Sequence, residues 1–113
     1  MTTKKINICG KDVTVAYCYA TEIAFRKYTD VTIEKFDANN PEHVMYVILA
    51  AAVAYAQSKG EDEKLQAEDL LYNASPEELV SAVTEIFHLR AQWYKVPTGE
   101  EDPQETDVKE KND

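Results

Sequence analysis

The sequence predicts an α+β protein that is mostly α-helical, with an N-terminal β-hairpin packed on a small helical bundle. Three observations support this fold class: apolar residues alternate over the first 17 positions, the spacing becomes helical from about residue 20, and a long apolar stretch occupies the middle of the chain. A length of 113 residues suits one domain. We place that single globular domain at residues 1–95 and predict a disordered acidic tail at 96–113.

The predicted hairpin covers residues 4–17. Its apolar residues alternate with polar ones in two runs, Ile6 and Ile8 followed by Val13, Val15 and Tyr17. Gly10-Lys11 lies between the runs, and glycine in first place suits a type II′ turn. This turn pairs Ile8 with Val13 and Ile6 with Val15, so that all four side chains share one face. Because an isolated hairpin is only marginally stable, we expect that face to pack on helices.

Four helices are expected at about 20–28, 41–58, 67–72 and 76–94. The second begins at an N-cap asparagine followed by Pro41, and Gly60 can end it. The last begins with a capping box in which Ser75 and Glu78 satisfy each other's backbone N–H groups. Residues 31–36 fit either a short strand or a single helical turn.

The second helix is the predicted centre of the fold, because residues 44–56 are apolar on every side. Such a helix in a water-soluble protein is buried against its own domain or against another chain. The run has 13 residues, fewer than the roughly 20 that span a bilayer, and the acidic net charge disfavours anionic membrane surfaces, so no membrane partner is expected. A net charge of −9 also argues against binding to nucleic acid phosphates.

The end of the chain differs from the rest in composition. Residues 96–113 contain seven acidic and two basic residues and almost no apolar ones. Such a segment cannot bury enough surface to offset the entropy of ordering it, which is the basis for predicting disorder there.

No arrangement of residues predicts catalysis, a cofactor or a metal site. The three glycines are isolated, so no phosphate-binding loop can be assembled from them. Glu85 and His88 form one Glu-x-x-His pair, but di-metal helical bundles need two such pairs and two further glutamates. With no export signal, Cys9 and Cys18 are expected to be reduced thiols. We therefore expect a protein that is not an enzyme.

The last helical turns contain the candidate partner-binding residues. Arg90, Trp93 and Tyr94 belong to the residue types that most often anchor protein interfaces. Two interpretations stay open for them: a contact patch for another protein, or simple packing onto the helical core. For Tyr46 and Tyr55 we expect core positions with the hydroxyl groups at the rim.

The order of these elements resembles the small tail assembly chaperones of siphophages and their prophages. The resemblance rests on the hairpin at 4–15, the Tyr-rich amphipathic helix at 19–29, the Ala-rich buried helix, the acidic short helix at 67–71 and the acidic extension. This family commonly has glycine after the first helix, where this chain has Asp30.

The resemblance implies a non-enzymatic factor in the cytoplasm of the host cell. It would bind and shield the long helical tape-measure protein during tail assembly, contact other tail proteins and self-associate in some circumstances. An exposed apolar stripe on a long helical protein needs temporary cover, and an acidic chaperone would keep the complex in solution. Two alternatives remain: a structural or connector component of the tail, and a small cytoplasmic protein-binding adaptor.

Overall fold

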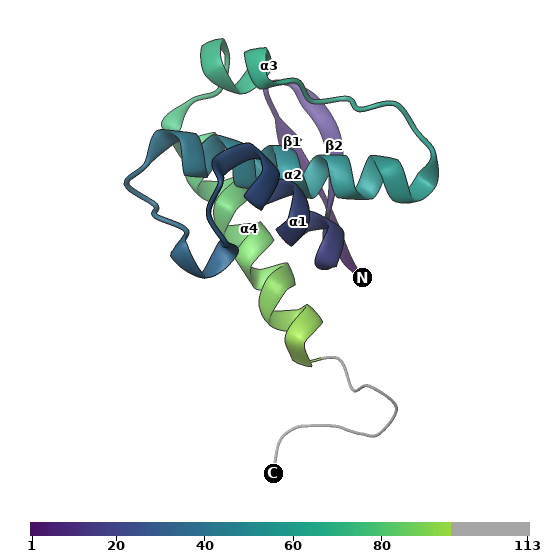
Figure 1. Cartoon of the computed structure of the whole chain (residues 1–113). Coiled ribbons are helices and arrows are strands. Elements are labelled where there is room, and N and C mark those ends of the chain that lie inside the picture. Colours follow the sequence, from purple (N-terminus) through teal and green to yellow (C-terminus); the bar gives the residue numbers. More distant parts are fainter. Residues whose placement is uncertain (96–113) are drawn as a thin grey trace.

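A computed structural model describes residues 1–95, and the predicted acidic tail at 96–113 lies outside these described residues. The chain forms a hairpin followed by helices (Figure 1). The elements are β1 (Thr2–Ile8), β2 (Lys11–Tyr17), α1 (Tyr19–Thr29), the 3₁₀ helix η1 (Ile33–Lys35), α2 (Pro41–Lys59), α3 (Ala67–Tyr72) and α4 (Pro76–Lys95). The predicted α+β class is confirmed, and residues 31–36 contain a helical turn rather than a strand.

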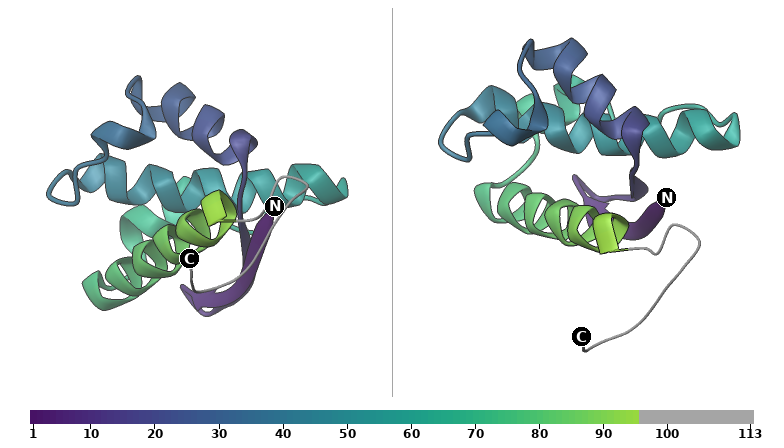
Figure 2. Two further views of the ribbon diagram at one scale, coloured as in Figure 1. Left: turned by 90° about the horizontal axis from the view of Figure 1, so that it is seen from below. Right: turned by 60° about the horizontal axis from the view of Figure 1, so that its bottom comes forward.

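Helix α2 occupies the middle of the molecule, as predicted. Figure 2 shows α1 on one side of it and the hairpin with α4 on the other. Met45, the whole run 47–54 and Ala56 are buried, so almost every side of the helix is covered. Helices α1, α3 and α4 and strand β2 all contact α2. Its alanines let these neighbours approach closely. Because α2 is covered on almost every side, its run of residues is apolar all round.

The hairpin confirms the predicted apolar face but corrects the turn. Cys9 and Gly10 are the central turn residues, with φ values of 56° and 72°, and Ile8 pairs with Lys11. Two positive φ values define a type I′ turn with glycine in second place, not the predicted type II′ turn at Gly10-Lys11. Ile6 therefore lies opposite Val13. The register differs by two residues, so the same side chains still face the core.

Contacts from distant segments hold the hairpin tip in this register. The Cys9 N–H donates to Glu78 Oε2 at 3.2 Å, and Lys11 Nζ donates to Asp69 Oδ2 and to the Lys64 carbonyl, both at 2.9 Å. These partners lie 53 to 69 residues away in sequence. The turn type is thus selected by tertiary contacts that the alternating pattern does not encode.

Both cysteines, Cys9 and Cys18, are free.

The helix ends follow their local signals. The Asn40 side chain caps α2 by accepting from the N–H groups of Glu42 and His43, and Gly60 ends the helix with a φ of 66°. The Ser75–Glu78 capping box is present, with both hydrogen bonds at 3.1 Å. Asp30 ends α1 with a φ of 64°, a left-handed conformation that glycine adopts without strain. The predicted helix bounds are therefore right to within one residue.

Candidate functional site

The last turns of α4 meet the beginning of α1 and the end of β2 in a cluster of aromatic rings. The Trp93 ring centroid lies 5.5 Å from that of Tyr17, 4.8 Å from that of Tyr19 and 4.9 Å from that of Tyr94. Tyr19 meets the indole edge-on, an arrangement that the ring quadrupoles favour. Trp93 itself is half-buried against the core. The cluster thus joins the end of α4 to the junction of β2 and α1, which lies far from it in the sequence.

One carboxylate connects the polar side of this cluster. Glu22 Oε2 accepts hydrogen bonds from the hydroxyl groups of Tyr17 and Tyr94, each at 2.8 Å. Burial, and then the bond to Glu22, raises the pKa of Tyr17, and the same carboxylate raises the pKa of Tyr94. Both shifts favour the protonated phenol, the form in which the hydroxyl group donates to the carboxylate. The arrangement fixes the end of α4 against α1.

Arg90 lies beside this carboxylate and over an aromatic ring. Its Nη2 atom is 3.6 Å from Glu34 Oε2, its Nε atom is 4.0 Å from Glu22 Oε2, and its guanidinium carbon lies 4.9 Å from the Tyr94 ring centroid. Two carboxylates and one ring therefore hold this cation near the surface. Glu34 belongs to η1, so the contact also attaches that short helix to α4.

The structure brings the three candidate residues together, but they do not play one role. Trp93 packs inward, Arg90 is 29% exposed as a side chain, and Tyr94 is 54% exposed. Their spacing in the sequence is compatible with one face of α4. Their partners on α1, Tyr19 and Glu22, were not predicted from the sequence. The sequence shows that α1 contains several apolar residues. It does not show which face of α1 is covered by α2 and which is left exposed.

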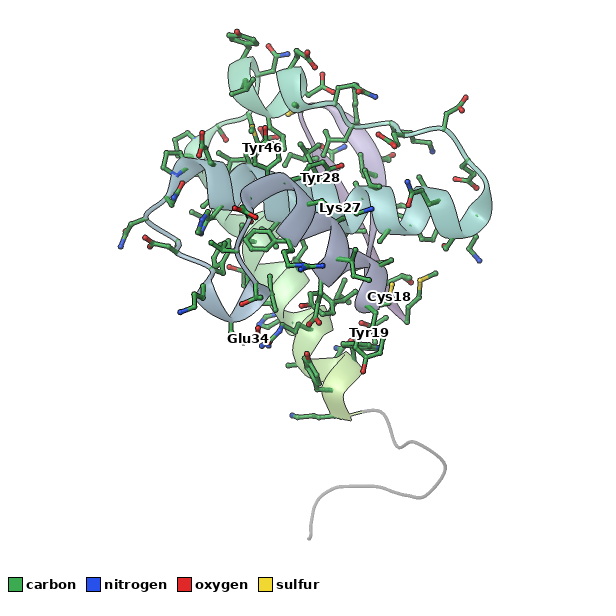
Figure 3. All side chains as sticks on the ribbon, viewed as in Figure 1. Cys18, Tyr19, Lys27, Tyr28, Glu34 and Tyr46 are labelled. Carbon is green, nitrogen blue, oxygen red and sulfur yellow. The ribbon has the colours of Figure 1, made fainter. Side chains whose placement is uncertain are left out.

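Helix α1 exposes an apolar surface next to this cluster. Tyr19 is 70% exposed and Ile23 is 47% exposed, although both lie on a helix whose opposite face is buried through Phe25. Together with Arg26 and with Ile33 and Glu34 of η1, they line a hollow of about 190 Å³. Tyr19 and Glu34 are labelled in Figure 3, near the crossing of α1 and α4. We call this region, defined by Tyr19, Ile23, Arg26, Arg90 and Tyr94, the α1–α4 surface.

Other aromatic and apolar side chains lie outside the α1–α4 surface. Tyr28 stacks on Tyr46 with ring centroids 5.1 Å apart, and Figure 3 shows both on the upper part of α1 and α2. Tyr46 and Tyr55, for which core positions were expected, are only half-buried, and of the two Tyr46 packs against the core. Leu71 and Tyr72, at the end of α3, are 58% and 80% exposed and offer a comparison for mutational tests.

The Glu-x-x-His pair is engaged in surface contacts. Glu85 Oε1 lies 3.0 Å from Lys4 Nζ and 4.0 Å from His88 Nδ1, and the imidazole is 68% exposed. Within residues 1–95, no three His, Cys, Asp or Glu side chains gather closely enough to hold a metal ion. Over the same residues, no helix has the length and apolarity needed to cross a bilayer.

A scan against protein-family models found no match for this chain, and searches of curated proteins and of solved structures found none either. The fold and the surface define a small hairpin-and-helix protein with a partly apolar face between its first and last helices. The resemblance to tail assembly chaperones stays a prediction that these comparisons do not test.

Proposed function

We propose that this chain is a non-enzymatic tail assembly chaperone that binds the tape-measure protein of a siphophage or prophage in the cytoplasm of its host. In this proposal the α1–α4 surface makes the contact and covers part of an apolar stripe on the long helical partner. The partner is proposed from the family resemblance, and the place of contact is proposed from the exposed residues of the α1–α4 surface.

The observation that carries the proposal is the exposure of Tyr19, Ile23 and Tyr94 on a rigid framework. Their exposed fractions are 70%, 47% and 54%. The Tyr94 hydroxyl is tied to Glu22, and the Tyr19 ring rests against Trp93, so little side-chain entropy remains to be lost on binding. Aromatic anchors held in advance are typical of interface hot spots.

Co-expression with a tape-measure protein tests the proposal. The tagged tape-measure protein should carry the chain through size-exclusion chromatography at low salt and keep itself in solution. Tyr19→Ser should weaken this complex about thirtyfold or more, since an interface anchor contributes about 2 kcal/mol or more. Tyr72→Ser is the matched control, because Tyr72 is 80% exposed on α3 and lies outside the α1–α4 surface.

The alternatives give different results in the same experiments. A structural or connector component would be retained in purified tails, whereas a chaperone would be absent from them. An adaptor for one host protein would form no complex with the tape-measure protein. Failure of the unaltered chain to bind any tape-measure protein at low salt would refute the proposal. Equal loss of binding in Tyr19→Ser and Tyr72→Ser would show that the α1–α4 surface is not the contact.

A further inference from the structure

The outward stripe of α1 has the form of a binding face for another helix. Tyr19, Glu22, Ile23 and Arg26 follow each other at intervals of three, one and three residues, so they lie on one side of two helical turns. All four line the hollow of about 190 Å³ beside η1. Two turns extend over about 10 Å along the helix axis.

The hollow has an apolar part, formed by Tyr19, Ile23 and Ile33, and a polar part, formed by Glu22, Arg26, Thr32 and Glu34. Ile33 of η1 is buried, with 4% of its surface exposed, while Ile23 and Tyr19 are partly open to water. The volume is several times the roughly 30 Å³ that one water molecule occupies in the liquid, which leaves room for a single apolar side chain.

Arg26 gives the hollow one free positive charge. The neighbouring Arg90 is already placed between Glu34 and Glu22, at 3.6 Å and 4.0 Å. Arg26 is exposed and has no ion pair within residues 1–95. A carboxylate brought beside it would therefore gain a partner without breaking an existing pair.

We infer that the hollow between α1 and η1 receives an apolar side chain from an amphipathic helix of the partner, and that a carboxylate one turn away on that helix pairs with Arg26. This inference rests on the proposed function and specifies which partner segment the α1–α4 surface selects. Residues four apart on a helix lie about 5–6 Å from each other, so one helix can present both groups together.

Two designed peptides test this inference. Both are alanine-based helices of 21 residues with one central leucine, and they differ only at the positions four residues before and after it, which are Glu in one peptide and Lys in the other. Fluorescence anisotropy at low and at physiological salt measures their affinities. The unaltered chain should bind the Glu peptide about two- to fivefold more tightly, the range expected for one exposed ion pair.

Charge reversal on α1 completes the test. Arg26→Glu should reverse the preference between the peptides, and Tyr19→Ser should weaken the binding of both. Lys27→Glu is the matched control, because Lys27 is the next residue, is also exposed and does not line the hollow. It should leave the preference unchanged. No binding of either peptide, equal affinities, or the same reversal in Lys27→Glu would overturn the inference.

The tape-measure complex separates failure of this inference from failure of the proposed function. If the unaltered chain and Arg26→Glu hold the tape-measure protein equally well, the inference is wrong while the proposed function stands. If the unaltered chain binds the Glu peptide selectively but no tape-measure protein, the acidic amphipathic helix is the right ligand class and the proposed function is wrong.

Discussion

Helices α1 and α2 are both rich in apolar residues, yet they use them in opposite ways. Almost all of the apolar side chains of α2 are buried by α1, α3, α4 and the hairpin. Helix α1 buries one face through Phe25 and leaves Tyr19 and Ile23 largely exposed on the other. The apolar content of a helix therefore does not indicate binding; what indicates it is apolar surface that the domain leaves uncovered.

The two helices also differ in what holds them. Apolar packing surrounds α2, while polar and aromatic contacts through Glu22 attach α1 to the end of α4. Apolar packing fails when a charge is placed inside it, whereas the polar contacts are lost one at a time. This difference predicts unequal responses to mutation in the two regions.

The largest effect is expected at the centre of α2. Leu49 is 5% exposed, and Leu49→Asp would bury a carboxylate with no partner, at a cost of several kcal/mol against a total stability of roughly 5–15 kcal/mol. The variant should fail to fold, as measured by circular dichroism and urea denaturation. Ile23→Asp on α1 is the control and should lower stability by no more than about 1 kcal/mol. A folded Leu49→Asp monomer would show that α2 is not an inner helix.

A smaller loss is expected where α4 joins α1. Tyr94→Phe removes the hydroxyl that donates to Glu22 and keeps the ring, so the free energy of unfolding should fall by about 0.5–1 kcal/mol. Urea denaturation measures the change. Tyr72→Phe, on a ring that is 80% exposed, should have no measurable effect. Identical stabilities for the two variants would mean that the Glu22 contact does not fix α4.

The end of α1 should respond in opposite directions to two substitutions. Asp30 has a φ of 64°, which glycine adopts freely and alanine does not. Asp30→Gly should raise the free energy of unfolding by about 0.5 kcal/mol, and Asp30→Ala should lower it by a similar amount. Thermal denaturation of both variants checks the sign. A shift in the same direction for both would contradict the left-handed end of α1.

The smallest expected effect is a loss of stability at low pH, which arises from a contact at the hairpin tip and not from α2. The Gln66 backbone N–H and then Lys11 lower the pKa of the Asp69 carboxylate in the folded chain. Its contribution to stability is therefore complete above the unfolded-state pKa and is lost as the pH falls through the lower, folded-state value. Denaturation between about pH 5 and 2 should show a shallower loss of stability in Asp69→Asn. Glu68→Gln, at an exposed neighbouring position, should follow the unaltered chain.

The sequence by itself determined the four α-helices and their ends. The Asn40 cap, the Ser75–Glu78 capping box and Gly60 are local signals, since each acts on backbone groups within a few residues. The apolar run of α2 likewise predicts a buried central helix, because the length and the periodicity of a segment are properties of that segment alone.

Only the tertiary structure decided the hairpin turn and the α1–α4 surface. The turn at Cys9-Gly10 is held by Glu78, and Tyr94 of α4 meets Glu22 of α1 across 72 positions of sequence. Alternating and helical patterns state which face of an element is apolar, but they do not state which neighbour covers it. Coverage depends on how separate elements pack, and this is why the same kind of side chain became core on α2 and exposed surface on α1.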